Sequence, residues 1–176
     1  MNIALIGSGR MGRMLESLCE KDEGLHVAGF VGRTGYASLA DMEQVDAALD
    51  FSYPGNLESL LACAVAKKIP LVIGTTGLSK EQGEAICKAS REIPIVWADN
   101  FSTGVTVLCR LARMAAQSLG DDFDIEIVET HHRQKEDAPS GTAKQLLAYM
   151  DPKHEHEIVY GREGHPGKRG REIGVH

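Results

Sequence analysis

Short apolar runs alternate with longer amphipathic runs along the first part of the chain. The apolar runs are mostly rich in Val and Ile and have the length of strands; they lie at 2–7, 25–31, 47–52, 70–75 and 94–99. Between most of these runs the apolar positions recur with helical spacing, over 10–21, 56–68 and 80–92. Strands that alternate with helices in this way predict a parallel, doubly wound α/β sheet of the Rossmann type.

The pattern changes near residues 100–122. A longer helix is predicted over 103–120, followed by one strong strand at 123–129. A further helix over 142–150 and a strand at 156–162 precede a tail rich in Gly and Arg. We therefore predict two domains, a doubly wound domain over 1–102 and a smaller α+β domain over 103–176.

The composition is typical of a globular protein and excludes several classes. Of the 176 residues, 43% are hydrophobic and 25% are charged, and the net charge is −6. A general nucleic-acid binder would be basic, and no apolar run approaches the length of a membrane span or a signal peptide core. The four cysteines are far apart, so we expect free, buried thiols in a reducing compartment, and hence a cytoplasmic protein.

A glycine-rich turn follows the first predicted strand and opens the first predicted helix. Residues 7–12 read G-S-G-R-M-G, which is a G-x-G-x-x-G motif in the context that dinucleotide binding requires. Gly7 would allow a tight turn, Gly9 a close approach of the pyrophosphate, and Gly12 close packing of helix on strand. The alternative is an ordinary glycine-rich turn between strand and helix. The motif predicts that residues 1–102 bind a dinucleotide.

The end of the second predicted strand bears on the choice of cofactor. An acidic side chain there would bind the ribose of NAD, but the chain has Gly32 and Arg33. Arg33 could instead contact a 2′-phosphate through a forked, charge-assisted interaction, although it could also be a solvated surface residue. We therefore expect NADPH to bind at least as well as NADH.

Polar residues gather where three further strands end. The segments are D-F-S at 50–52, V-I-G-T-T-G at 72–77 and D-N-F-S at 99–102, and all would lie at the ligand-binding edge of such a sheet. Each could alternatively be plain turn and cap chemistry. We take Phe51 in the first segment as a further cofactor contact.

One segment of the second domain is crowded with basic groups. Residues 129–143 read E-T-H-H-R-Q-K-E-D-A-P-S-G-T-A, in which Ser140 suits a helix N-cap and Gly141 and Thr142 the first helical turn. The free N–H groups of such a helix start bind anions, and the upstream cations would add to this. A histidine near neutral pH suits a proton donor. We predict a site for a small dicarboxylate that is protonated during reduction.

Two other interpretations of this segment are a solvated basic turn before a well-capped helix, and a metal site. Adjacent histidines on a strand point to opposite faces, and no ligand spacing completes a metal site, so we expect no metal.

Taken in order, these segments resemble the 4-hydroxy-tetrahydrodipicolinate reductase family, formerly called dihydrodipicolinate reductase, of the diaminopimelate–lysine pathway. The segment 129–143 is the most specific part of a resemblance that covers essentially the whole chain. The resemblance implies NADH or NADPH as cofactor, a homotetramer built through the C-terminal sheet, and further residues after His176. It also implies that residues 103–176 form a substrate and oligomerisation domain, incomplete as given.

The resemblance further implies roles for individual residues. His131 would be the general acid, assisted by Lys135. The substrate carboxylates would be held by His132, Ser140, Gly141 and Thr142. The dinucleotide would contact Gly7, Arg10, Met11 and Gly12, and the nicotinamide would be lined by Gly74, Thr76, Asn100 and Phe101.

Two alternatives of different kinds remain at this point. One is another amino-acid or semialdehyde dehydrogenase on the same fold; the latter would need a cysteine on a loop, whereas all four cysteines fall in predicted helices. The other is a non-catalytic dinucleotide-binding module or an inactive fragment, which would have no need for a proton donor, a lysine and an anion-binding helix start together.

Overall fold

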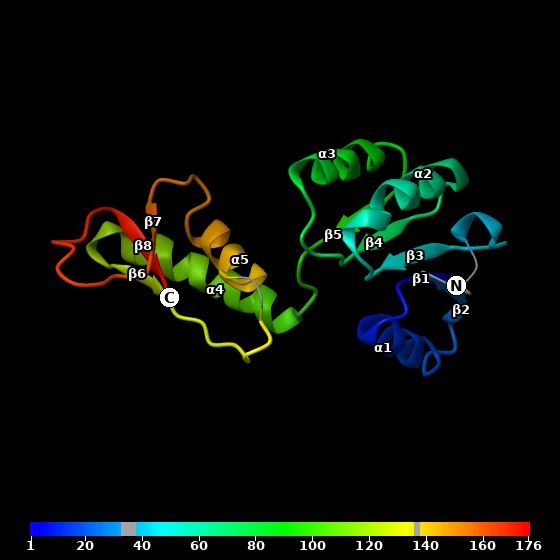
Figure 1. Ribbon diagram of the computed structural model, residues 1–176, viewed down its shortest axis with the longest axis horizontal. Helices are drawn as coiled ribbons and strands as arrows, with labels where there is room; N and C mark the ends of the chain where they lie inside the picture. The colour runs from blue at the N-terminus through cyan, green and yellow to red at the C-terminus, as the bar shows by residue number, and fades with distance from the viewer. Residues whose placement is uncertain (33–37, 136–137) are drawn as a thin grey trace. The chain divides into compact units, whose positions relative to one another are not determined.

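The computed structural model describes residues 1–32, 38–135 and 138–176 of the chain. Its internal contacts divide it into two compact units, Met1–Asp99 and Asn100–His176 (Figure 1). The two units are described separately below.

The first unit is built on a five-stranded sheet in which every neighbouring pair is parallel. The strands are β1 (Asn2–Ile6), β2 (His26–Val31), β3 (Ala47–Asp50), β4 (Leu71–Ile73) and β5 (Ile95–Trp97), in the order β2-β1-β3-β4-β5. The helices are α1 (Arg10–Cys19), α2 (Leu57–Lys67) and α3 (Lys80–Ala89). Figure 1 shows α1 on one face of the sheet and α2 and α3 on the other. The predicted doubly wound parallel sheet is therefore confirmed.

Strand β1 contributes to both cores of this unit, because its side chains alternate between the two faces of the sheet. Ile3 and Leu5 pack with Phe30 in the core that also takes Leu15 of α1. Ala4 and Ile6 belong to the larger core, which contains the buried residues of α2 and α3. Burial on both faces explains why this strand is a continuous apolar run in the sequence.

Two helix starts can be expected from the sequence, because Ser79 and Gln82 have the spacing of a capping box and Pro54 suits a first helical turn. Ser79 caps α3 in a capping box, with Gln82 N–H bonded to the Ser79 hydroxyl and the Gln82 side chain bonded to Ser79 N–H, as the spacing predicts. Pro54 begins a 3₁₀ turn, Pro54–Asn56, and α2 itself begins only at Leu57. A second 3₁₀ turn, Leu39–Asp41, precedes β3.

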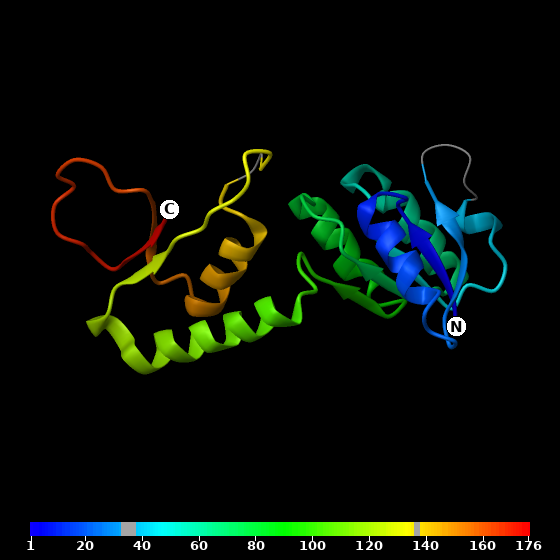
Figure 2. The same cartoon turned by 90° about the horizontal axis from the view of Figure 1, so that it is seen from below.

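The second unit combines two helices with a three-stranded parallel sheet (Figure 2). Its elements are α4 (Thr103–Leu119), a 3₁₀ turn (Gly120–Asp122), β6 (Ile125–Ile127), α5 (Gly141–Met150), β7 (Glu157–Tyr160) and β8 (Glu172–Val175). The sheet order is β6-β8-β7. Buried Ile127 and Val175 of the sheet pack with buried Ala143 of α5, so the helix that begins at Ser140 is anchored on the sheet.

The central strand of this sheet was missed in the sequence, where residues 172–175 were assigned to a tail rich in Gly and Arg. The strand has only four residues, and Gly174 in its middle weakens the apolar pattern. Gly174 lies against the Glu126 carboxylate on the neighbouring strand, which an added Cβ would displace.

The expectation of four buried thiols was partly wrong. All four cysteines are free and lie in helices, and Cys19 and Cys109 are buried. Cys63 is only half-buried, although it packs against the larger core, and Cys87 is exposed. In the described part of the chain, no helix is long and apolar enough to cross a membrane.

Candidate active site

The glycine turn follows β1 at the carboxyl edge of the sheet. Gly7 has a φ of +100°, and an added Cβ would lie 2.6 Å from the Phe51 carbonyl oxygen. An added Cβ at Gly12 would overlap the Gly7 carbonyl oxygen. At Gly9, by contrast, an added Cβ would meet no described protein atom within 4 Å. The protein's own packing therefore requires glycine at positions 7 and 12, whereas position 9 presents open backbone to a ligand.

The first turn of α1 is suited to an anion. Gly9 is its N-cap and provides no side-chain hydrogen bond, and the first turn contains no acidic residue. The N–H groups at such a helix start need an acceptor, and the helix dipole favours a negative one. Arg10 and Met11 are exposed in this turn, with Met11 45% accessible. The turn therefore fits the pyrophosphate of a dinucleotide.

A buried carboxylate joins the ends of β3 and β4. Asp50 is 1% exposed and accepts hydrogen bonds from the Ser52 hydroxyl at 2.6 Å and the Thr75 hydroxyl at 2.8 Å. The Thr75 oxygen also accepts the Ser52 N–H at 2.9 Å. Burial raises the pKa of Asp50, and the bonds from Ser52 and Thr75 offset part of that rise. The sequence indicated the two segments but not this link between them.

These hydrogen bonds lie next to the residues that are expected to contact the cofactor. Phe51 lies between Asp50 and Ser52, and an added Cβ at Gly74 would overlap the Phe51 ring, so the ring lies directly against the backbone at the end of β4. Thr76, two residues further, is exposed. The structure thus brings together Phe51 and Gly74, which the sequence assigned to the cofactor site from separate segments.

Asn100, Phe101 and Arg33 were also predicted to contact the cofactor. Asn100 and Phe101 belong to the second unit, where the Asn100 side chain accepts the Ser102 N–H at 2.7 Å and donates to the Thr142 hydroxyl at 3.3 Å. Arg33 lies outside the residues that the structure describes.

The crowded segment is not part of a strand. Strand β6 ends at Ile127, so His131 and His132 lie in irregular backbone, and the strand geometry used to separate the two histidines was wrong. A turn begins at His132, whose ring Nδ1 accepts the Gln134 N–H at 3.2 Å and whose carbonyl accepts the Lys135 N–H at 3.1 Å. Among the described residues there is no cluster of three or more His, Cys, Asp or Glu that could hold a metal ion.

Glu129 organises this segment, and the sequence did not assign it a role. Its carboxylate accepts the Ser140 N–H at 2.8 Å and the Ser140 hydroxyl, and lies 3.0 Å from His131 Nε2. The two bonds from Ser140, followed by the bond to His131, hold the pKa of Glu129 at about 2. The only indication of this role in the sequence was that Glu129 is the first residue of the segment. Its partner Ser140 lies 11 residues further along the chain, so no local pattern connects the two.

Ser140 caps α5 as predicted, and its hydroxyl group makes two hydrogen bonds within the protein. The side chain is 4% exposed; its oxygen accepts the Ala143 N–H at 3.1 Å while its proton goes to Glu129. Gly141 is exposed and Thr142 half-buried, and within the described structure no backbone or side-chain acceptor is found for their N–H groups. These two N–H groups are therefore available to an anionic ligand.

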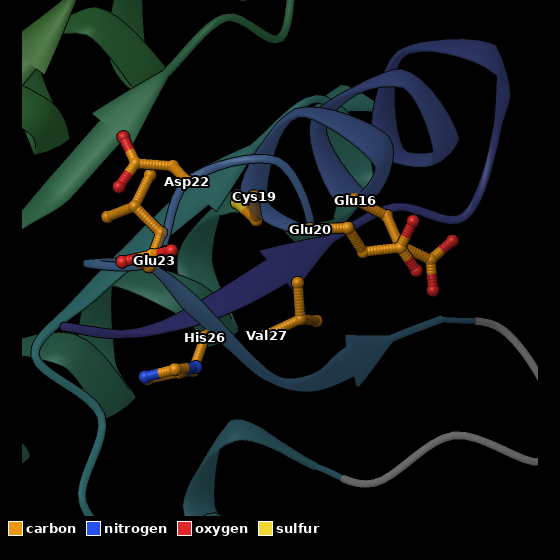
Figure 3. A pocket seen from close by; sticks show the side chains of 8 residues that line it. Glu16, Cys19, Glu20, Asp22, Glu23, His26 and Val27 are labelled. Carbon is orange, nitrogen blue, oxygen red and sulfur yellow. The ribbon is translucent and has the colours of Figure 1, made fainter.

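A hollow at the opposite edge of the first unit has the wrong charge for such a ligand (Figure 3). It measures about 370 Å³ and lies between the end of α1 and the start of β2. Figure 3 shows the carboxylates of Glu16, Glu20, Asp22 and Glu23 around it. They would repel a dicarboxylate, so this hollow does not fit such a ligand.

Two family models match the chain, one over each unit. The family model described as "Dihydrodipicolinate reductase, N-terminus" matches residues 1–101, and "Dihydrodipicolinate reductase, C-terminus" matches 104–176. The chain belongs to the dihydrodipicolinate reductase family. The members of this family are pyridine-nucleotide-dependent reductases, so the predictions of an oxidoreductase and of a nicotinamide cofactor are confirmed at that level.

Curated relatives are similar over nearly the whole chain. The 4-hydroxy-tetrahydrodipicolinate reductase of Pseudoalteromonas atlantica is 41% identical over 197 residues, which cover 97% of this chain and 74% of the relative. The enzyme of the same name from Akkermansia muciniphila is 44% identical over 176 residues, covering 96% of this chain and 70% of the relative. These matches support the reductase interpretation over a semialdehyde dehydrogenase or a non-catalytic module.

Among solved structures, the dipicolinate-bound dihydrodipicolinate reductase from Paenisporosarcina sp. TG-14 has a TM-score of 0.73 and 22% sequence identity. The match covers 99% of this chain and 77% of that one, and it supports the α/β fold.

Proposed function

We propose that the protein catalyses the NAD(P)H-dependent reduction of a cyclic imine dicarboxylate, 4-hydroxy-tetrahydrodipicolinate or its dehydrated form, to tetrahydrodipicolinate. This is the reaction for which its relatives are named. The observation that carries the proposal is one short segment with three kinds of group. It contains the imidazole of His131, the ammonium group of Lys135, and the two backbone N–H groups at the start of α5 that the Ser140 cap does not bind. The reduction adds one hydride and one proton to the ring, and the hydroxylated form also loses water.

The dinucleotide would be held by the first unit. Backbone N–H groups from Gly9 to Gly12 would bind the pyrophosphate, and Phe51 with Gly74 would lie beside the nicotinamide end. When bound, a reduced nicotinamide supplies the hydride. Thr76, Asn100 and Phe101 are proposed as further contacts of the nicotinamide.

The second unit would bind the two carboxylates. The N–H groups of Gly141 and Thr142 belong to the first turn of α5, at the positive end of the helix dipole. Lys135 and His132 belong to the turn that precedes this helix. A carboxylate at an open helix start makes charge-assisted hydrogen bonds, which are stronger than neutral ones. Ser140 would contribute by fixing the start of this helix, because its hydroxyl group already donates to Glu129 and accepts the Ala143 N–H.

His131 would supply the proton. As hydride reaches the ring, negative charge develops on the neighbouring atoms, and a nearby acid lowers the barrier by neutralising it. Lys135 adds positive potential at the place where this charge develops. A solvated basic turn, the alternative interpretation, would make neither residue important for turnover.

We also propose that NADPH serves at least as well as NADH. The chain has Arg33 where an NAD-specific site would have an acid, and a guanidinium suits a 2′-phosphate.

We further infer a cytoplasmic homo-oligomer. Four free thiols suit a reducing compartment. The second unit also exposes large apolar side chains, among them Phe123, Val128 and Tyr160, which an interface between copies would cover.

The proposal is tested by steady-state kinetics on His131→Gln and Lys135→Ala. We expect kcat to fall roughly a hundred- to ten-thousand-fold in His131→Gln, the usual effect of removing a general acid, with a smaller change in substrate affinity. In Lys135→Ala both kcat and substrate affinity should suffer. Both variants should still bind NADPH in calorimetry.

Matched controls are available in the same unit. His165→Gln and Lys153→Ala make the same chemical changes at exposed positions and should leave the kinetics unchanged. If His131→Gln and Lys135→Ala behave like these controls, the segment is not the active site.

A further inference from the structure

The carboxylate of Glu129 connects the proposed proton donor to the proposed anion site. One oxygen accepts the Ser140 N–H at 2.8 Å, and the other accepts the Ser140 hydroxyl and lies 3.0 Å from His131 Nε2. Ser140 in turn caps α5 through the Ala143 N–H. A single carboxylate therefore sets both where the imidazole lies and where the N–H groups of α5 begin.

We propose that Glu129 is a positioning residue for catalysis, which holds the Nε2–H of His131 and leaves Nδ1 as the atom that gives its proton to the substrate. This rests on the proposed function, since it assigns a role within the same reaction.

The chemistry of the contact determines the direction of proton transfer. An ionised carboxylate only accepts hydrogen bonds, so the ring nitrogen that faces it must carry a proton. Its pKa of about 2 keeps Glu129 ionised across the neutral range. Because the Nε2–H group is hydrogen-bonded to Glu129, the proton that His131 can give to a substrate is the one on Nδ1, on the other side of the ring.

The Ser140 bonds explain why this arrangement can be precise. Glu129 lies in irregular backbone, but its two oxygens are fixed to the N-cap of a helix that packs on the sheet through buried Ala143. A proton donor works only if it is held within a narrow range of positions. The carboxylate therefore transfers the rigidity of α5 to the His131 ring.

The test compares Glu129→Gln with the parent protein, using the same substrate and NADPH. Gln has the same shape and can still accept the Ser140 N–H, but it has no charge and can present an amide N–H to His131. We expect kcat to fall roughly ten- to a hundred-fold, part of the usual contribution of a positioned acid, with KM changed by less than about threefold.

Two further measurements separate positioning from stability. Ser79→Ala removes the equivalent serine cap from α3; it should lower the thermal midpoint without changing kcat. Nitrogen-15 shifts of the His131 ring should show a protonated Nε2 when the ring of the parent protein is neutral, and this signature should be lost in Glu129→Gln.

The outcomes distinguish this inference from the proposed function. An active parent whose kcat and His131 nitrogen-15 shifts are unchanged in Glu129→Gln would overturn the positioning role alone. A folded parent that binds NADPH but does not reduce the substrate would overturn the proposed function itself.

Discussion

Gly12→Ala should damage both the first unit and its dinucleotide site. The added methyl group would overlap the Gly7 carbonyl oxygen and lie 3.0 Å from the Gly7 carbonyl carbon. Carbon atoms normally approach to about 3.5–4.0 Å, so the start of α1 must move by roughly 1 Å. Because the obstacle is backbone, no side-chain rotation can relieve the clash. Overpacking of this kind costs about 1–3 kcal/mol of folding free energy.

The same displacement should weaken NADPH binding at least about tenfold, which corresponds to about 1.4 kcal/mol. Gly9→Ala provides the contrast, because its methyl group meets no described protein atom within 4 Å. It should leave the unfolding midpoint unchanged and still weaken NADPH binding, since the space above Gly9 belongs to the ligand. Gly170→Ala, at an equally open position in the second unit, should change neither quantity.

Chemical denaturation and titration calorimetry on the three variants measure both effects. A folded Gly12→Ala protein with parental stability would refute the packing argument. Parental NADPH affinity in Gly9→Ala would show that the pyrophosphate does not lie over this turn.

Three further predictions concern other residues. Arg33→Ala should weaken NADPH by about 1–3 kcal/mol in calorimetry and NADH much less, and equal losses would exclude a 2′-phosphate contact. Thr75→Val should lower the free energy of unfolding by about 2–3 kcal/mol, because buried Asp50 loses a hydroxyl donor; a change below about 0.5 kcal/mol would show that this bond is unimportant. Glu129 has a folded-state pKa of about 2 against an ordinary value of 4.5, so its contribution to stability is complete above about pH 5 and is lost as the pH falls toward 2. The urea midpoint should therefore fall more between pH 5 and pH 3 in the parent than in Glu129→Gln, and parallel curves would contradict this.

The sequence predicted those parts of the structure that depend on local chemistry. The glycine turn, the capping box at Ser79 and the N-cap at Ser140 are set by residues within three or four positions of one another. Strands β1 and β4 of the first sheet were found because burial makes each a compact apolar run.

The features that were missed depend on contacts between distant segments. Asp50 and Thr75 are 25 residues apart, and Glu129 and Ser140 are 11 apart, so no local pattern pairs them. Strand β8 pairs with β6, about 50 residues earlier in the chain, and Gly174 lies against the Glu126 carboxylate of that strand. A four-residue strand that contains glycine has a weak local pattern, so its place in the sheet could not be predicted from the sequence.

The central claim is that this protein transfers hydride to a cyclic imine dicarboxylate and adds a proton through His131. The most direct measurement uses NADPH deuterated on the transferred side of nicotinamide C4, with freshly prepared 4-hydroxy-tetrahydrodipicolinate, and analyses the product by mass spectrometry. We predict tetrahydrodipicolinate with one deuterium atom from the cofactor, and a turnover that collapses in His131→Gln. A product without deuterium, or no oxidation of NADPH by a folded protein that binds it, would contradict the account.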